Sequence, residues 1–149
     1  MLAEIPTTLK IEHDELHAEL VKATKAGGRT GEAANAVARV LHDHFVKEED
    51  YALPPLGILK KLAHGTVQPE MAEVLQMTDR LEAELGTMLA EHESIVAELG
   101  KLKDAASVEG RPDVVRFAEK LMLHARTEEE VLYPAAILIG RYLKLMLAG

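Results

Sequence analysis

Apolar residues recur at steps of three and four along most of this chain, and this spacing constrains the fold more than any other feature. Residues spaced in this way line one face of an α-helix, and other helices are needed to bury that face. Alanine, leucine, glutamate and lysine dominate, whereas aromatic residues make up only 3% of the chain. Such a composition favours helices over strands. The sequence therefore predicts an all-α fold.

Glycine and proline residues divide the helical pattern into four long segments and a short helix at the C-terminus. Because proline removes a backbone donor and clashes with the preceding turn, Pro54 and Pro134 should each end or kink a helix. The 149 residues, of which 48% are hydrophobic, are enough to bury a continuous core. We therefore expect a single domain over residues 1–149. We expect the first long helix to run from Thr7 or Thr8 to before Gly27, and the second from after Gly31 to Pro54. The third should run from Pro69 to about Leu102, with or without a break near Thr78, and the fourth from after Pro112 to Tyr133.

Charge and composition exclude several classes of function. A net charge of −8 argues against binding to nucleic acid. The absence of cysteine excludes disulfides, thiolate zinc sites and cysteine-ligated clusters, so any metal must be bound by imidazole and carboxylate. The N-terminus lacks the pattern of a secretory signal, and Arg141 and Lys144 interrupt the apolar C-terminal segment. We therefore expect a cytoplasmic protein that does not bind membranes.

The two halves of the chain match each other. HDELHAEL from His13 aligns with HESIVAEL from His92, 79 residues later, and HFVKEEDYALP from His44 aligns with HARTEEEVLYP from His124, 80 residues later. A loop easily absorbs the difference of one residue. Two helix pairs built on one pattern predict a four-helix bundle with an internal pseudo-twofold axis, in which equivalent residues face each other across the middle.

Polar residues interrupt the apolar faces at equivalent places in the two halves. Residues four apart on a helix lie about one turn, or roughly 6 Å, apart on nearly the same face, so each HxxxE can direct an imidazole and a carboxylate at one point. Two facing buried glutamates would repel unless a proton or a cation lay between them. A metal pair bridged by both glutamates would leave positions for solvent, dioxygen, peroxide or nitric oxide. The candidate ligands are His13, His44, Glu48, His92, His124 and Glu128.

A first-helix histidine, an HxxxE, a third-helix histidine and a second HxxxE together resemble the hemerythrin-like, or HHE cation-binding, domain over nearly the whole chain. The resemblance implies an up-down four-helix bundle with a non-haem di-iron centre whose two ions share an oxo or hydroxo bridge. Zinc and manganese are alternatives, since imidazole and carboxylate suit several metals. By this resemblance, one iron would take His13 and His44, the other would take His92 and His124, and the bridging ligands would be Glu48 and Glu128.

The chain departs from the oxygen-carrying members that it resembles. Met88 stands where they have a further histidine, and their fourth-helix aspartate falls at Glu129, whereas the best match here is Glu128. These departures disfavour reversible oxygen carriage. We expect a protein that binds or senses oxygen or nitric oxide, or that handles iron. The alternatives are a di-iron enzyme that reduces nitric oxide or peroxide, and a structural helical module without metal; the sequence does not decide whether there is turnover.

The remaining histidines and one methionine have simpler interpretations. His17 lies one turn after His13 and could chelate with it, but its repeat partner is Val96, which favours a residue flanking the site. HDELH also resembles the HExxH metalloprotease motif but lacks its glutamate. We expect His42 at the surface, His64 in a turn, and Met88 in the core.

Acidic residues and tyrosines beside the HxxxE motifs leave their interpretation open. Glu49, Asp50, Glu129 and Glu130 most simply form a solvated face, although one of them could hydrogen-bond to a ligand. Tyr51 and Tyr133 could hydrogen-bond near the metals, and ordinary packing explains them equally well.

Overall fold

A computed structural model describes residues 3–148, and within them the chain forms helices and no strands. This confirms the predicted all-α class. Among the described residues, no helix combines the length and the apolar character needed to cross a membrane. The long helices are α1 (Thr7–Thr24), α2 (Gly28–Lys47), α4 (Val74–Val108), α5 (Pro112–Thr127) and α6 (Tyr133–Leu147).

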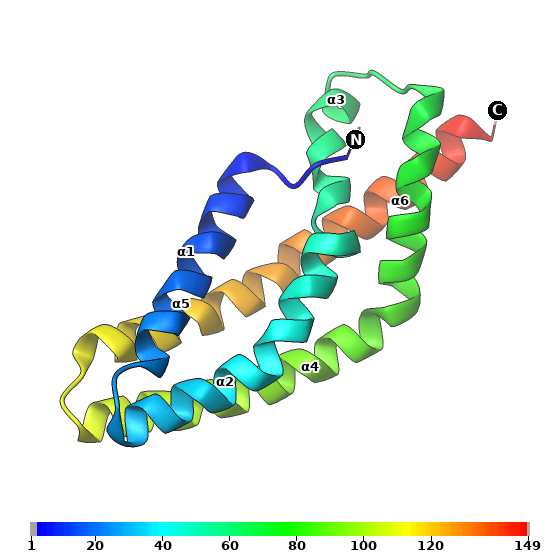
Figure 1. Ribbon diagram of the computed structural model, residues 1–149. Coiled ribbons are helices and arrows are strands. Elements are labelled where there is room, and N and C mark those ends of the chain that lie inside the picture. The colour runs from blue at the N-terminus through cyan, green and yellow to red at the C-terminus, as the bar shows by residue number, and fades with distance from the viewer. Residues whose placement is uncertain (1–2, 149) are drawn as a thin grey trace.

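The long helices form a four-helix bundle in which α6 continues the line of α5 (Figure 1). Helix α1 packs against α2 and α5, and α4 packs against the same two helices from the other side. Short connections join α1 to α2 and α4 to α5. The longer connection between α2 and α4 contains the 3₁₀ turns Pro54–Ile58 and Pro69–Glu73 and the short helix α3 (Leu59–Ala63). The predicted up-down bundle is confirmed.

A π-helical turn begins at the glutamate of each HxxxE motif, at Glu48–Ala52 and at Glu128–Leu132. In each turn the residue that follows, Leu53 or Tyr133, donates its backbone N–H to the carbonyl oxygen of the glutamate. The two prolines then behave differently. Pro54 opens a 3₁₀ turn, whereas Pro134 lies in the first turn of α6, where a missing N–H is tolerated, and the helix continues.

Helix α2 begins at Gly28, four residues earlier than the sequence predicted. The Glu109 carboxylate, which follows the end of α4, accepts hydrogen bonds from the backbone N–H groups of Arg29 (3.1 Å) and Thr30 (2.8 Å). These are among the first amides of α2, which have no partner within their own helix. A distant side chain thus supports the early start. Helix α4 also differs from expectation, because it runs unbroken past Thr78 and ends at Val108.

The apolar core is divided into two clusters of buried side chains. One cluster fills the bundle near the α1–α2 and α4–α5 connections, with Leu41 and Leu99 among its members. The other fills the opposite end, around α6 and the first half of α4, and contains Leu53 and Leu81. Along α2, α4 and α5, the polar residues of the repeated motifs lie between the two clusters.

Candidate metal centre

All six predicted ligands meet inside the bundle, in the polar layer between the two apolar clusters. Each is at most 5% exposed. Such burial is unusual for glutamate, which is almost never fully buried unless it is paired. The six side chains come from four helices and the two π turns: His13 from α1, His44 from α2, His92 from α4, His124 from α5, and Glu48 and Glu128 from the π turns.

The donor atoms fall into two groups. His44 and His92 converge with Glu48 and Glu128, and their rings lie 4.6 Å apart, centre to centre. His13 and His124 converge with Glu128, with ring centres 5.3 Å apart. The expected pairing of His13 with His44, and of His92 with His124, is therefore wrong. Each group instead joins one histidine from each half of the chain.

Both glutamates offer one oxygen to each group. Glu128 Oε1 lies 3.1 Å from His92 Nε2, and Glu128 Oε2 lies 3.1 Å from His124 Nε2. Glu48 Oε2 lies 3.5 Å from His44 Nε2, and Glu48 Oε1 lies 3.3 Å from His13 Nε2. This is the arrangement expected of two carboxylates that bridge a pair of cations.

Two buried atoms in this layer have no hydrogen-bond partner among the described residues, His13 Nε2 and Glu48 Oε1. They face each other at 3.3 Å without the alignment of a hydrogen bond. An unsatisfied buried polar atom costs about 1–3 kcal/mol, so native structures rarely leave one without a reason. A cation between the two atoms would satisfy both. Imidazole nitrogen and carboxylate oxygen are suitable donors for iron, manganese or zinc, and the residues therefore fit a metal.

A carboxylate lies beside the outward nitrogen, Nδ1, of each of the four histidines. The distances are 3.2 Å for His13 and Glu49, 2.9 Å for His44 and Glu91, and 3.0 Å for His92 and Glu129, and Glu12 contacts His124 in the same way. When Nδ1–H donates to a carboxylate, Nε2 keeps its lone pair for a metal and the ring is held in place. All four rings are thus oriented toward the interior.

These outer carboxylates follow the repeat. Glu12 and Glu91 each precede a site histidine, and Glu49 and Glu129 each follow a site glutamate. Glu49 and Glu129 each hydrogen-bond to a candidate ligand, one of the two interpretations that the sequence left open. Glu12 and Glu91 were missed, although their positions match at the same offset of 79 residues as His13 and His92.

The sequence profile of the family described as "Hemerythrin HHE cation binding domain" matches residues 4–136. The chain belongs to this family. The match spans all six candidate ligands, and the family together with the buried His/Glu cluster indicates metal binding. No curated protein and no solved structure is a significant match to the chain.

Tyr133 is a further buried residue of this hemerythrin HHE domain that contacts the site. Its hydroxyl donates to Glu48 Oε2 at 2.6 Å and lies 3.2 Å from His44 Nε2 and 3.1 Å from His92 Nε2. Burial and the nearby Glu48 carboxylate raise its pKa above the usual value. Tyr51 is also buried, but its hydroxyl contacts Glu84 and the Met88 sulfur instead. Met88 is fully buried, as expected of a core residue.

In the metal-free chain, protons bound to the histidines balance the negative charge of the buried carboxylates of the HHE site. Burial disfavours the charged form of His13, but hydrogen bonds and charge from Glu128 and Glu48 outweigh it and raise its pKa to about 10. The pKa values of His44 and His124 rise for the same reason. Burial opposes the charged form of Glu128, yet hydrogen bonds from the site histidines hold its pKa well below the usual range. A metal would have to displace these protons.

A surface pocket of about 200 Å³ between α1 and α2 reaches the HHE site at His13. His17 and His42 line it, together with Val46 and Phe45, whose ring stacks on His13 at 4.2 Å. His17 is exposed, takes part in neither ligand group and flanks the site, as the sequence favoured. His42 is exposed, as expected, and His64 is also exposed, at the end of α3.

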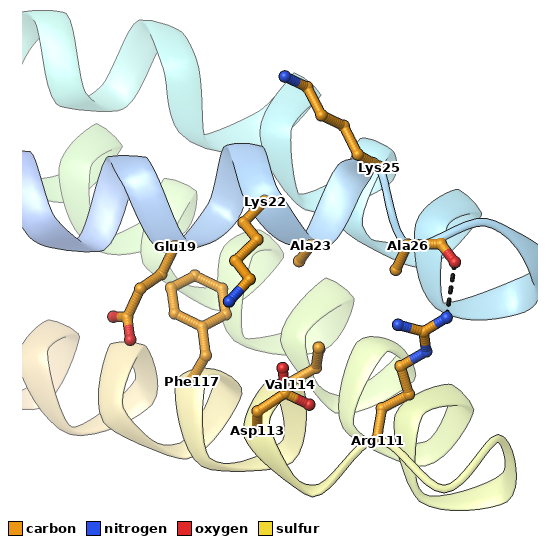
Figure 2. Close-up of a pocket in the computed structure, with 9 residues that line it drawn as sticks. All are labelled: Glu19, Lys22, Ala23, Lys25, Ala26, Arg111, Asp113, Val114 and Phe117. Carbon is orange, nitrogen blue, oxygen red and sulfur yellow. Dashed lines mark hydrogen bonds between the residues drawn. The ribbon is translucent and has the colours of Figure 1, made fainter.

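A larger pocket, of about 370 Å³, lies near the far end of the bundle between α1 and α5 (Figure 2). Its lining mixes lysines and acidic residues, and Arg111 closes one side by donating to the Ala26 carbonyl oxygen at 2.8 Å. None of the six candidate ligands lines this pocket. It is therefore separate from the metal centre.

Proposed function

We propose that this hemerythrin HHE domain binds two iron ions, one at each histidine group, and presents them to a small diatomic ligand such as oxygen or nitric oxide. The observation that supports the proposal is the pair of buried glutamates, each with one oxygen toward each group. Iron would supply redox chemistry and open coordination positions that imidazole and carboxylate lack. Handling of iron itself would use the same ligands.

The residues of the chain divide the work of such a site. Glu48 and Glu128 would hold the two ions together, and four imidazoles would complete the protein ligand set. The outer carboxylates keep each imidazole nitrogen directed inward. The apolar clusters on both sides limit the access of water, and a site of low polarity strengthens the electrostatic interactions within it.

The first test is the metal content of protein prepared without a metal-binding tag and reconstituted anaerobically with ferrous iron. We expect about two irons per chain and, after exposure to air, an absorption band of an oxo-bridged ferric pair. Protein that takes up no iron under these conditions would be a structural module. Uptake of zinc or manganese in preference to iron would retain the site and refute the assignment of iron.

Variants show whether the six residues are the ligands. Glu48→Ala and His124→Ala should each abolish binding of the metal pair while most of the helical circular dichroism remains, since both apolar clusters are intact. His64→Ala is the matched control, because it removes an exposed histidine that belongs to neither group. Full metal content in both site variants would refute the ligand set.

Whether the site also catalyses a reaction is a separate measurement. With nitric oxide or peroxide and an external reductant, a binding protein reacts once per metal pair, whereas an enzyme turns over many times. We expect the single, stoichiometric reaction, and repeated turnover with either substrate would indicate an enzyme instead.

A further inference from the structure

We propose that His17 and His42 bind a divalent transition-metal ion at the surface between α1 and α2, and that this ion passes from there to the interior centre. The surface site depends only on its own geometry, whereas the passage inward rests on the proposed function. Imidazole pairs bind first-row ions such as ferrous iron, nickel and zinc. Neither histidine belongs to the two interior groups.

His17 and His42 lie opposite each other on neighbouring antiparallel helices (Figure 1). His13 and Val46 line the same pocket between α1 and α2. One helical turn from each of them, toward the short α1–α2 connection, leads to His17 on α1 and His42 on α2. Both histidines line this pocket of about 200 Å³ and also a smaller one of about 80 Å³. The two imidazoles thus lie together, between the pockets.

Both imidazoles are accessible to an ion in solution. His17 and His42 are exposed, whereas the four histidines of the interior groups are buried. Exposed side chains change rotamer within nanoseconds, so both rings can turn toward one ion. Two imidazoles that bind one ion form a chelate, in which the second bond forms at a high effective concentration. The pair should therefore bind an ion more tightly than His64, which is exposed at the end of α3.

Acidic side chains make the mouth of this pocket attractive to cations. Asp14 and Glu49 line the pocket together with the two histidines. Lys10 pairs with both, at 3.1 Å from Asp14 and 3.2 Å from Glu49, so two negative charges lie beside one positive charge. A pocket with an excess of one sign of charge raises the local concentration of ions of the opposite sign. Asp14 also lies about one turn before His17, where it can supply a third donor atom.

The inner end of the pocket reaches a candidate ligand of the interior centre. His13 lines it, and Glu49 Oε2 lies 3.2 Å from His13 Nδ1. Phe45, whose ring stacks on His13 at 4.2 Å, lines the same pocket. An ion released from His17 and His42 toward the interior therefore meets Glu49 and His13 next.

Retention of the chain without a tag on immobilised Ni²⁺ tests the surface site. We expect the unmodified chain to be retained. His17→Gln and His42→Gln should each elute as early in an imidazole gradient as the double variant, because a chelate needs both rings. The buried histidines cannot contact the resin. His64→Gln is the matched control, since it removes the third exposed histidine, and should elute with the unmodified chain. Equal losses from all three variants, or none from His17→Gln and His42→Gln, would refute the chelate.

The rate of anaerobic ferrous iron uptake tests the passage inward. We expect His17→Gln and His42→Gln to load about tenfold more slowly than the unmodified chain and His64→Gln, at the lower end of the 10–10³-fold gain from concentrating an ion at a charged pocket. All four chains should reach the same final iron content. Equal rates would refute the passage. A lower final content in either slow variant would also refute it, because the histidine would then be a ligand of the centre itself.

The two experiments together separate this inference from the proposed function. Retention that needs both histidines, with no iron uptake by any chain, would refute the proposed function and the passage and would confirm the surface site. Uptake of iron by all chains, with retention that is independent of His17 and His42, would refute this inference alone.

Discussion

Each site histidine has a glutamate beside its outward nitrogen, Nδ1, and these four glutamates hold the imidazole rings in place. Glu91 is held at both oxygens, because its second oxygen pairs with Lys47 at 2.7 Å. Lys47 and His44 hold the pKa of Glu91 below its usual value against the opposing effect of burial. It therefore remains a carboxylate that fixes the His44 ring at neutral pH.

Glu91→Gln should lower metal affinity about 10–100-fold, the usual range for loss of a hydrogen-bond partner of a ligating histidine. The amide can still contact Nδ1, but it no longer carries the charge that raises the basicity of the ring. Competition with a chelator of known affinity measures the change. Glu93→Gln, on an exposed face of the same helix, is the control and should leave the affinity unaltered.

Metal affinity should rise with pH between 6 and 8. In the metal-free chain the pKa of His13 is raised to about 10, so its proton stabilises the fold fully below pH 6.5, and this stabilisation is lost as pH rises toward 10. Metal binding must release that proton. The affinity should increase about tenfold per pH unit for each proton displaced. Titration in weak buffer with a pH indicator counts the protons, and an affinity independent of pH would contradict the expectation.

At the scale of residues, the sequence located the six candidate ligands but did not pair the histidines correctly. The repeat pointed to all six candidate ligands, because histidine and glutamate are seldom buried at matching places of two helix pairs unless they share a site. It could not decide which histidines belong to one group. Each helix of the bundle contacts two others, and the motif does not specify toward which of them the histidine side chain is directed. Glu12 and Glu91 are half exposed and resemble ordinary surface residues of a helix, which is why they were missed.

Between elements, α4 and α6 approach each other closely at Gly140. A Cβ atom added at Gly140 would lie 2.6 Å from the Thr78 Cβ atom, closer than real side chains come. Gly140→Ala should therefore destabilise the fold by about 1–3 kcal/mol, the usual effect of overpacking. Chemical denaturation monitored by circular dichroism measures the loss.

Two further variants show whether the contact between Gly140 and Thr78 causes the loss of stability. Gly86→Ala, where a new Cβ would meet nothing within 4 Å, should stabilise α4 by about 0.5–1 kcal/mol. Thr78→Ala combined with Gly140→Ala should recover much of the lost stability, because the threonine side chain is the obstacle. Equal stability of Gly140→Ala and the unmodified chain would mean that α6 shifts freely on α4.

Helix existence was predictable, whereas several helix ends were not. Spacing of apolar residues located the helices of the four-helix bundle. The early start of α2 depends on Glu109, which lies 79 residues after Thr30 and whose approach only the fold reveals. The same limit applies to proline. Pro54 and Pro134 occupy matching places in the repeat, and only the following residues decide that one opens a turn and the other a continuing helix.

For the molecule as a whole, the metal should contribute to stability without being required for the helices. A ligand that binds only the folded chain stabilises it by about 2.7 kcal/mol at a concentration one hundred times its Kd. Chelation of the metal should therefore lower the melting temperature of the unmodified chain and leave that of Glu48→Ala unchanged. Differential scanning calorimetry with and without chelator measures both. A chain whose melting ignores the chelator would hold no metal.

The two π turns extend the likeness of the two halves from the sequence to the backbone. A π turn contains one residue more than the α-helical turn it replaces, and both halves have it at the same glutamate. The likeness ends at the next residue, because Leu53 joins the apolar core in one half, whereas Tyr133 donates a hydrogen bond to Glu48 in the other. The two halves thus share a backbone, and single side chains set them apart.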